Sequence, residues 1–599
     1  MELAQVSLND KYALEEGRIY LTGVQALVRL PLMQAARDRA AGLTTAGFIS
    51  GYRGSPLGTY DSALWGAKSF LAERNIHFQP GVNEDLGATA VWGSQQVNLF
   101  KGAKVDGVFG IWYGKGPGVD RSLDALKHAN AAGSSRHGGV LALAGDDHGC
   151  QSSTLPHQSE QVFQAAMIPV LNPATVQEYL DFGLLGFAMS RFTGCWIGFK
   201  AISEAVESSA SIAVDIGRPE IVVPADFEMP ADGLNIRYPD PPMAMEARLH
   251  GPKMQAVAAF ARANGLDRVV FEPDRPARIG IVATGKAYLD LRQALTDLGL
   301  RPDRLHEMGV RIYKVGMPWP LEAEGALRFA EGLQDIIVVE EKRGLIEDQL
   351  MKLLYRLPAD RRPSICGKTD EGGRILLPSL GELNPAMVAR TVAERLQRHD
   401  MVDAAMSQRL ARIREKEAQA AAPPPKTVRT PFFCSGCPHN TSTKVPEGSR
   451  AMAGIGCHGM ALWMPDRNTQ TITHMGGEGV NWIGQAPFAG DNHVFQNLGD
   501  GTYYHSGLLA IRAAAAAGVN ITYKILFNDA VAMTGGQHHD GPLTVWDITR
   551  QVESEGAKRI VVVTDEPDKY PTGVHWAPKV EIRHRDELDA VQRELRDTP

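Results

Sequence analysis

The stretch that most constrains this chain lies between residues 499 and 537 and is rich in glycine. It begins with Gly499-Asp500-Gly501 after an apolar run, continues through an alanine-rich segment, and reaches a second apolar run that ends at Asn528. This order predicts strand, helix and strand, which brings Asp500 and Asn528 to the carboxyl ends of neighbouring parallel strands. Their oxygens suit a hard cation such as Mg²⁺, and the flanking glycines let the backbone approach a diphosphate closely. The alternative is a plain Gly-Asp-Gly turn, but the position of Asn528 and the following Thr534-Gly535-Gly536-Gln537 favour a cofactor site.

Length and composition describe a large globular protein. A chain of 599 residues is too long for one hydrophobic core, so several domains are expected. Its hydrophobic content of 44% and charged content of 22% are ordinary for such proteins. The net charge of −7, with no basic stripe, predicts no nucleic-acid partner. No apolar run approaches the length of a spanning helix, and the first residues do not resemble a signal peptide, so we expect a cytoplasmic protein without membrane contact.

Short apolar segments alternate with helical patterns along the chain, which predicts parallel α/β units. The predicted parts are a first domain over 16–215 that opens with a helix over 16–30, an irregular proline-rich connection over 216–275 with one helix near 244–263, a second domain over 276–398, a linker over 399–429, and a third domain over 430–599. The triple proline Pro423-Pro424-Pro425 marks the linker.

Two further polar groups stand out in the first predicted domain. Glu84 begins a helix that is rich in glycine and alanine. A carboxylate shielded from water can exchange protons with a ligand, although the common role of such a residue is to complement the helix dipole. Arg53 and Ser55 lie upstream in the loop Gly51-Tyr52-Arg53-Gly54-Ser55-Pro56.

Three of the six cysteines, Cys434, Cys437 and Cys457, lie close together in the sequence. Clustered thiols in a reducing compartment indicate metal or redox chemistry. Their spacing alone suits a structural zinc site completed by His439 or His458. The scattered cysteines are predicted to be small buried hydrophobic residues. They are Cys150, Cys195 and Cys366.

A series of motifs along nearly the whole chain resembles the 2-oxoacid:ferredoxin oxidoreductase family, and within it the thiamine-diphosphate-carrying subunit of indolepyruvate ferredoxin oxidoreductase. The motifs are Gly51 to Pro56, Val82-Asn83-Glu84, Asp146-Asp147-His148-Gly149 with Ser152-Ser153, Cys434-Ser435-Gly436-Cys437-Pro438-His439, Gly454-Ile455-Gly456-Cys457, and Ala532 to Gln537. The chain departs from the family's pattern at Arg53, Ser55 and Gly536. These departures could alter which oxoacid side chain is accepted.

The resemblance implies a fold of three parallel-sheet α/β domains of the thiamine-diphosphate-enzyme type: pyrimidine-binding, transketolase-C-terminal-like and diphosphate-binding. It also implies roles for residues of the chain. Glu84 would contact the aminopyrimidine of thiamine diphosphate; Asp500, Asn528 and the Ala530 carbonyl would bind Mg²⁺; Gly499, Gly501, Thr534, Gly535 and Gln537 would line the diphosphate site; Arg53 and Ser55 would lie near the substrate. His505, at the start of the predicted cofactor helix, is a further catalytic candidate.

By the same resemblance, Cys434, Cys437 and Cys457 would be ligands of a [4Fe–4S] cluster, which normally has four thiolates. The fourth has no counterpart in this chain, so we expect a truncated form, or a missing C-terminal region or gamma-type subunit that completes it. The implied reaction is oxidative decarboxylation of a 2-oxoacid, such as indolepyruvate or another arylpyruvate, to acyl-coenzyme A, with electrons passing through the iron–sulfur centre to ferredoxin. A homodimer or hetero-oligomer is expected.

Two other functions stay open at this point. One is a non-oxidative thiamine-diphosphate decarboxylase or ligase with a structural zinc at the cysteines. The other is a non-catalytic assembly subunit, against which the presence of Glu84, Asp500 and Asn528 argues.

Overall fold

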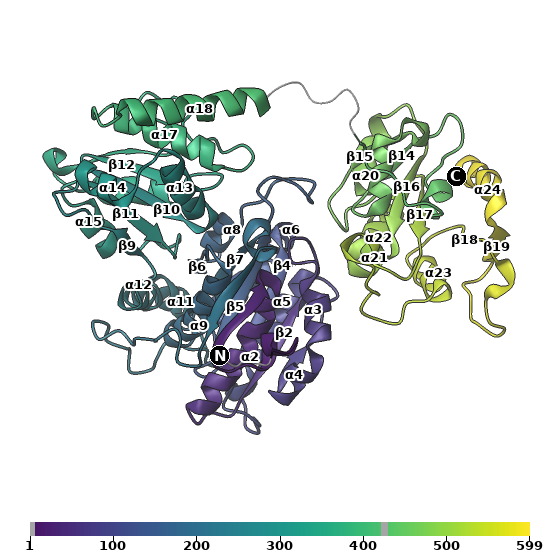
Figure 1. The fold of residues 1–599 in the computed structure, drawn as a ribbon. Coiled ribbons are helices and arrows are strands. Elements are labelled where there is room, and N and C mark those ends of the chain that lie inside the picture. The colour runs from purple at the N-terminus through teal and green to yellow at the C-terminus, as the bar shows by residue number, and fades with distance from the viewer. Residues whose placement is uncertain (1–5, 421–428, 599) are drawn as a thin grey trace. The chain divides into compact units, whose positions relative to one another are not determined.

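The computed structural model describes residues 6–420 and 429–598 (Figure 1). The chain divides into two compact units, residues 1–422 and 423–599. The division falls inside the stretch predicted as a linker, 399–429. The triple proline Pro423-Pro424-Pro425 lies outside the described residues.

The first unit begins with a six-stranded parallel sheet in the order β3-β2-β4-β5-β7-β6 (Figure 1). Its strands are β2 (Thr45–Gly51), β3 (Ile76–Phe78), β4 (Gly107–Lys115), β5 (Val140–Asp146), β6 (Val170–Leu171) and β7 (Ile197–Ile202). Successive side chains of a strand point to opposite faces. Thus Ile111 and Tyr113 of β4 pack with helices α2 (Gly23–Ala40) and α9 (Val176–Thr193), whereas Trp112 packs with α5 (Glu84–Gln95) and α7 (Leu123–Ala132). Both faces of this sheet are therefore covered.

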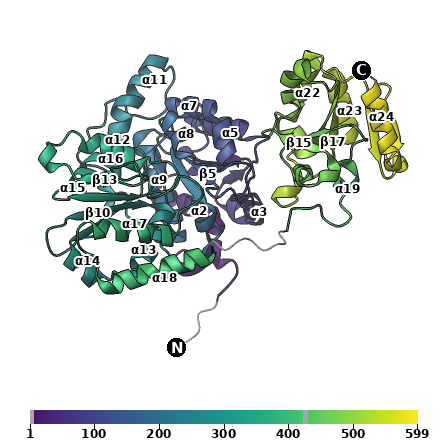
Figure 2. The same ribbon diagram turned by 90° about the horizontal axis from the view of Figure 1, so that it is seen from above.

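A second sheet in the same unit has the order β13-β12-β10-β11-β9. Two of its strands, β10 and β13, are labelled in Figure 2. Its strands are β9 (Arg268–Phe271), β10 (Ile279–Thr284), β11 (Val310–Val315), β12 (Asp335–Val339) and β13 (Ser364–Cys366). Four are parallel, and β9 pairs antiparallel with β11. Helices α13 (Gly285–Asp297) and α17 (Pro385–Gln397) share one core cluster, and α15 (Ala323–Ala330) and α16 (Ile346–Leu354) share another.

The second unit is built on a four-stranded parallel sheet in the order β15-β14-β16-β17. Its strands are β14 (Ala451–Ala453), β15 (Thr469–Ile472), β16 (Val494–Gly499) and β17 (Ile521–Leu526). Helix α22 (Leu508–Ala517) connects β16 to β17. A separate two-stranded sheet, β18 (Val561–Thr564) and β19 (Glu581–His584), follows α23 (Val545–Ser554) and precedes the last helix, α24 (Leu588–Asp597).

The three larger sheets share one topological feature. In each, the strand that comes first among the parallel strands has the next two on opposite sides: β2 between β3 and β4, β10 between β11 and β12, and β14 between β15 and β16. The crevice at the carboxyl ends of the first and third of these strands is the switch point, where open α/β sheets bind ligands. The fold therefore offers three such crevices.

The structure corrects the prediction of a helix over residues 16–30. Residues Gly17–Thr22 form strand β1, which pairs antiparallel with β8 (Ser209–Val214), and the helix begins at Gly23. Thr22 accepts a hydrogen bond from the Gln25 backbone while the Gln25 side chain accepts one from Thr22, a capping box that starts the helix.

The connection over 216–275 is also more ordered than predicted. The single helix expected near 244–263 is divided into α11 (Pro242–Arg248), η2 (Leu249–Lys253) and α12 (Met254–Ala263), since Gly251 and Pro252 interrupt it. Strand β9 of the second sheet also lies in this stretch, so that sheet begins before residue 276. Within residues 6–420 and 429–598, no helix combines the length and the apolar character needed to cross a membrane.

Candidate functional site

Glu84 lies at the switch point of the first sheet, as the first residue of α5. Asn83 caps this helix, because its side chain accepts a hydrogen bond from the Leu86 backbone at 3.0 Å. The Glu84 carbonyl accepts a hydrogen bond from the Trp112 indole of β4 at 2.8 Å. These contacts hold the residue at the carboxyl ends of β2 and β4, and only 8% of Glu84 is exposed.

Two glycines form a cradle around the Glu84 side chain. A Cβ atom at Gly118, in α6 (Gly116–Arg121), would come within 2.5 Å of Glu84 Cγ and 2.9 Å of its Oε1. A Cβ atom at Gly114 would lie 3.5 Å from Glu84 Cγ. Position 118 thus has no room for a side chain, and the carboxyl group lies where water has little access.

Arg53 and Ser55 lie in the loop after β2, at the same edge of the sheet. The Arg53 Nε donates a hydrogen bond to Asp61 at 2.8 Å, and the Tyr113 hydroxyl donates to the same carboxylate. Burial raises the pKa of Asp61, and the Arg53 charge acts in the opposite direction. Arg53 therefore helps to hold this loop in place. Ser55 is half-buried.

In the second unit the structure brings Asp500 and Asn528 together. Asp500 follows β16 and Asn528 lies beyond the end of β17, and the Asn528 backbone donates a hydrogen bond to Asp500 Oδ2 at 2.9 Å. Asp500 Oδ1 accepts a second bond from the Gly501 backbone at 2.9 Å. Asp500 is buried, whereas Asn528 is exposed and its Oδ1 accepts a bond from the Ala530 backbone at 3.2 Å.

Thr534 and Gln537 close the loop that follows Asn528. The Thr534 hydroxyl lies 3.1 Å from Gln537 Oε1, and Gln537 Nε2 donates to the Thr534 carbonyl at the same distance. Gly535, with a φ of +127°, makes the turn between them, a conformation that side chains disfavour. These residues shape a compact loop next to Asn528 and Ala530.

His505 is buried in η7 (Tyr503–Gly507), one turn beyond Asp500. Its Nδ1 lies 2.6 Å from the Ser506 hydroxyl. A helix that widens for one turn is often found at a functional site. His505 therefore lies buried close to Asp500 in the chain and stays a candidate.

The three clustered cysteines lie near one another but do not converge. Burial and then the neighbouring Cys437 and Cys434 thiols raise the pKa of Cys457. Cys437 Sγ lies 3.2 Å from His439 Nδ1, and the His439 and His458 rings stack with centroids 6.5 Å apart. Within residues 6–420 and 429–598, no three histidine, cysteine or acidic side chains are grouped to hold a metal ion. In this arrangement the thiols do not form a ligand set for a cluster.

Sequence reasoning missed Glu478, which is fully buried at the switch point of the third sheet. It accepts hydrogen bonds from the Gly476 and Ile455 backbones at 2.7 and 3.4 Å, and a Cβ atom at Gly454 would lie 2.2 Å from Glu478 Cγ. The signal in the sequence is the run Gly476-Gly477-Glu478-Gly479, an acidic residue among glycines like that around Asp500.

The chain is similar in sequence to known oxidoreductase subunits. Residues 269–421 match the family model described as "Indolepyruvate oxidoreductase domain". Indolepyruvate oxidoreductase subunit IorA of Methanothermobacter marburgensis is 25% identical over 547 residues, which cover 88% of this chain and 77% of that protein. The same subunit of Thermococcus kodakarensis is 23% identical over 460 residues, 70% of this chain and 66% of that protein.

Among solved structures, 2-oxoglutarate:ferredoxin oxidoreductase from Magnetococcus marinus aligns with a TM-score of 0.44 and 14% identity, over 64% of this chain and 66% of that one. The relationship therefore rests on the sequence matches. By those matches, the chain is distantly similar, over most of its length, to indolepyruvate oxidoreductase subunit IorA.

Proposed function

We propose that this chain is the thiamine-diphosphate-binding part of a 2-oxoacid oxidoreductase. The observation that carries the proposal is the hydrogen bond between Asp500 and the Asn528 backbone, which brings two oxygen-bearing side chains to the carboxyl ends of adjacent strands. The homology to indolepyruvate oxidoreductase subunit IorA supports the reaction class. In this proposal the two sheets of the first unit belong to the pyrimidine-binding and transketolase-C-terminal-like domains, and the second unit is the diphosphate-binding domain.

The residues of the second unit fit Mg²⁺ and a diphosphate. Each Asp500 oxygen accepts one backbone hydrogen bond and retains a lone pair, and Asn528 Oδ1 and the Ala530 carbonyl are further oxygen donors of the kind Mg²⁺ prefers. Gly499 and Gly501 have no side chain that would stand between the backbone and phosphate oxygens. Thr534, Gly535 and Gln537 belong to the loop that follows Asn528 and would line the diphosphate site.

Glu84 fits the role of the carboxylate that faces the aminopyrimidine. In its cradle of Gly114 and Gly118, the side chain is shielded from water, so it can hold a proton against N1′ of the cofactor without competition from solvent. When bound, thiamine diphosphate supplies the nucleophile and the electron sink for decarboxylation. Arg53 and Ser55 line the same edge of the sheet and would contact the substrate.

The proposed substrate is a 2-oxoacid, with indolepyruvate or another arylpyruvate favoured by the names of the relatives. The products would be CO₂ and an acyl-coenzyme A, with coenzyme A as co-substrate and ferredoxin as electron acceptor. Partners would be a gamma-type subunit or a further C-terminal region, in a homodimer or hetero-oligomer. The cysteines do not converge among the described residues. A [4Fe–4S] cluster at Cys434, Cys437 and Cys457 therefore stays a prediction.

The experiment that tests this function is anaerobic purification, metal analysis and a 2-oxoacid panel with coenzyme A and a viologen dye as artificial electron acceptor. We expect iron in the protein and dye reduction that requires thiamine diphosphate, with the fastest rate for an arylpyruvate. Aldehyde release without dye reduction would contradict the oxidoreductase assignment.

The contact between Cys437 and His439 keeps one second candidate open, a non-oxidative thiamine-diphosphate decarboxylase or ligase with structural zinc. One zinc per chain, no iron and aldehyde as the product would establish it. Failure to bind thiamine diphosphate at all would instead indicate a non-catalytic assembly subunit.

A further inference from the structure

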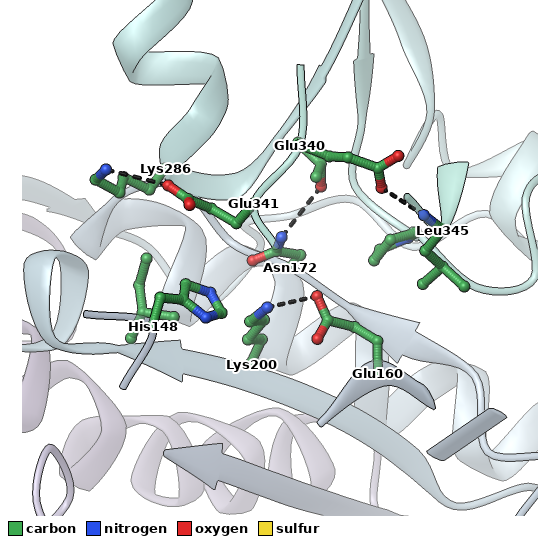
Figure 3. A pocket seen from close by; sticks show the side chains of 11 residues that line it. His148, Glu160, Asn172, Lys200, Lys286, Glu340, Glu341 and Leu345 are labelled. Atoms are coloured by element: carbon green, nitrogen blue, oxygen red, sulfur yellow. Dashed lines mark hydrogen bonds and ion pairs between the residues drawn. The ribbon is translucent and has the colours of Figure 1, made fainter. Parts of the chain in front are cut away.

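The switch point of the second sheet contains a polar pocket that the proposed function does not use (Figure 3). Thr284 lies at the end of β10, and Glu340 and Glu341 follow β12. From the first sheet come Lys200 of β7 and, near the end of β5, His148. The carboxyl edges of both sheets of the first unit therefore meet around one cavity.

The charges around this cavity are already paired. Lys200 forms an ion pair with Glu160 of α8 (Glu160–Ala165) and lies 3.6 Å from Asp146. Lys286 lies 3.0 Å from Asp290 and 3.1 Å from Glu341, and it also donates to the Leu383 carbonyl. Each lysine already has two carboxylate neighbours, so an anion would enter without a free counter-charge, which is costly in a buried site, and no lysine charge is left to be matched by a ligand. The site favours a neutral occupant.

Two acceptor atoms in the wall of the cavity have no protein partner. His148 Nδ1 lies 2.9 Å from the His157 carbonyl, which can only accept, so Nδ1 carries the proton. Burial, and then the charge of Lys200, hold the pKa of His148 well below its ordinary value, so the ring is neutral and Nε2 is an acceptor. Within the described part of the chain, neither His148 Nε2 nor Glu160 Oε2 makes a hydrogen bond, although both residues are at least 95% buried.

Size and chemistry together select the occupant. The cavity volume is about 10 Å³, close to the space that one water molecule needs. Water can donate to two acceptors at once, and buried polar atoms without a protein partner are commonly satisfied in this way. Lys200, with two carboxylate neighbours, retains a third N–H that can donate to the same molecule.

We propose that the switch point of the second sheet is a site for one internal water molecule, which donates hydrogen bonds to His148 Nε2 and Glu160 Oε2. The site stands independently of the proposed function, since its evidence is a cavity and two acceptors. The water fixes the His148 ring, and through it the loop that runs from Asp147 to His157.

This loop reaches from the cavity to the wall of the Glu84 site. His148 bonds the His157 carbonyl, and a Cβ atom at Gly116 would lie 2.5 Å from His157 Cβ. His157 Nε2 lies 3.3 Å from Asp120 Oδ2, in the same helix α6 that carries Gly118. The water site thus supports, through His148 and His157, the helix that forms the cradle of Glu84. His148 acts here as a positioning residue.

Crystal structures of the full chain test the proposal directly. We expect one ordered water within hydrogen-bonding distance of both His148 Nε2 and Glu160 Oε2. His148→Gln places an acceptor near the position of Nε2 and should keep the water. His148→Asn retains a donor toward His157 and loses the acceptor, so it should lose the water. A dry cavity in the unaltered protein, or density for a larger or charged molecule, would overturn the proposal.

Thermal unfolding supplies a second measurement in solution. No direct hydrogen bond joins His148 to Glu160 Oε2 among the described residues, so the routes of coupling between them are the water and the charge of Lys200, which pairs with Glu160. We expect the Tm losses of His148→Asn and Glu160→Gln to be non-additive, with the double variant losing about 2 °C less than the sum. Strictly additive losses would count against a shared water.

Discussion

The Glu84 site and the Asn528 site both lie at the carboxyl edge of a parallel sheet, the first at a switch point and the second beyond an edge strand, and they differ in how completely the protein builds them. Glu84 is 8% exposed and lies in a glycine cradle at the edge of a sheet that helices cover on both faces. Asn528 is exposed, and every residue of β17, the edge strand before it, is half-buried. A groove lined by β17, α23 and β18 runs beside that strand.

The difference indicates that the first site is preorganised for its ligand, whereas the second must rearrange when its ligand binds. The Glu84 carboxylate is placed before any cofactor arrives, because its backbone and both walls are fixed. The Asn528 side chain instead bonds the Ala530 backbone within its own loop, so a cation must compete for this oxygen. The free energy needed to order that loop then reduces the net affinity of the second site. Proton exchange at the first site should therefore be sensitive to single substitutions of the residues around Glu84. Cation binding at the second site should tolerate single substitutions better.

The largest effect is expected for Glu84→Gln, which keeps the shape of the side chain and removes its proton exchange. We expect hydrogen–deuterium exchange at C2 of added thiamine diphosphate, followed by NMR, to slow by about 10²–10⁴-fold. Asp85→Asn is the matched control, since Asp85 is the next residue of α5 and its carboxylate lies 3.4 Å from Arg121 at the surface. Equal slowing in both variants would show that Glu84 has no special role.

A smaller but still large effect is expected for Gly118→Ala. The added Cβ would lie 2.5 Å from Glu84 Cγ, so the carboxyl group must move. We expect a loss of stability of about 1–3 kcal/mol, as for other over-packed sites, measured by urea unfolding, together with slower exchange at C2. Gly93→Ala, in α5, meets no atom within 4 Å and should be stabilising by up to about 1 kcal/mol. Unaltered exchange in Gly118→Ala would contradict a preformed cradle.

Asn528→Ala should weaken Mg²⁺ binding in the presence of thiamine diphosphate by about tenfold, or about 1.4 kcal/mol. The effect is modest because Asp500 and the Ala530 carbonyl remain and water can replace the lost oxygen. Titration of Mg²⁺ by calorimetry measures it. Asn520→Ala, at the opposite end of β17, should have no effect. A complete loss of binding in Asn528→Ala would mean that this site is as rigidly built as the first.

The effects with the least bearing on the two sites concern two lysines of lowered pKa, the buried Lys253 in the first unit and the half-buried Lys524 in the second. Burial and then Arg467 lower the pKa of Lys524 to about 7, and burial lowers that of Lys253 to about 8. Between these values and the ordinary lysine pKa near 10.4, the unfolded chain binds a proton that the folded chain does not, so each lysine makes stability rise with pH across that window. Below the folded pKa both states are protonated and the dependence disappears.

Comparison with Lys524→Met and Lys253→Met isolates these contributions. Relative to its variant, the unaltered protein should gain a few kcal/mol in free energy of unfolding across the window, at most about 1.4 kcal/mol per pH unit, and the window opens near pH 7 for Lys524 and near pH 8 for Lys253. Urea unfolding between pH 6 and pH 10 measures both. A gain that falls as pH rises would contradict the burial of these amines.

Local patterns in the sequence predicted much of the candidate site. Asp500 and Asn528 could be placed because each follows an apolar run, and Glu84 because it precedes a helix of small residues. Strand β1 was missed because its partner, β8, is far away in the sequence, and the alternation of buried Ile19 and Leu21 with exposed neighbours is too short to outweigh the helical pattern that follows. Pairing over such distances leaves no local signal.

The water site could not be predicted for the same reason. His148, Glu160 and Lys200 come from one sheet, and Thr284 and Glu340 from another. The sequence around each of these residues gives no sign that they share a cavity. The two acceptors without a partner can be recognised only in the folded structure, where the carboxyl edges of the two sheets meet. The cysteines show the opposite case, since Cys434, Cys437 and Cys457 are conspicuous in the sequence but do not converge in the structure.

The central claim is that Asp500 anchors a magnesium–diphosphate site, and calorimetric titration of thiamine diphosphate in the presence of Mg²⁺ tests it most directly. Asp491→Ala is the control, because Asp491 is exposed and pairs with Arg450 at 2.7 Å. We predict binding by the unaltered protein and by Asp491→Ala, and affinity at least about 100-fold weaker in Asp500→Ala, as expected for loss of a charged metal ligand. Unchanged affinity in Asp500→Ala would contradict the account.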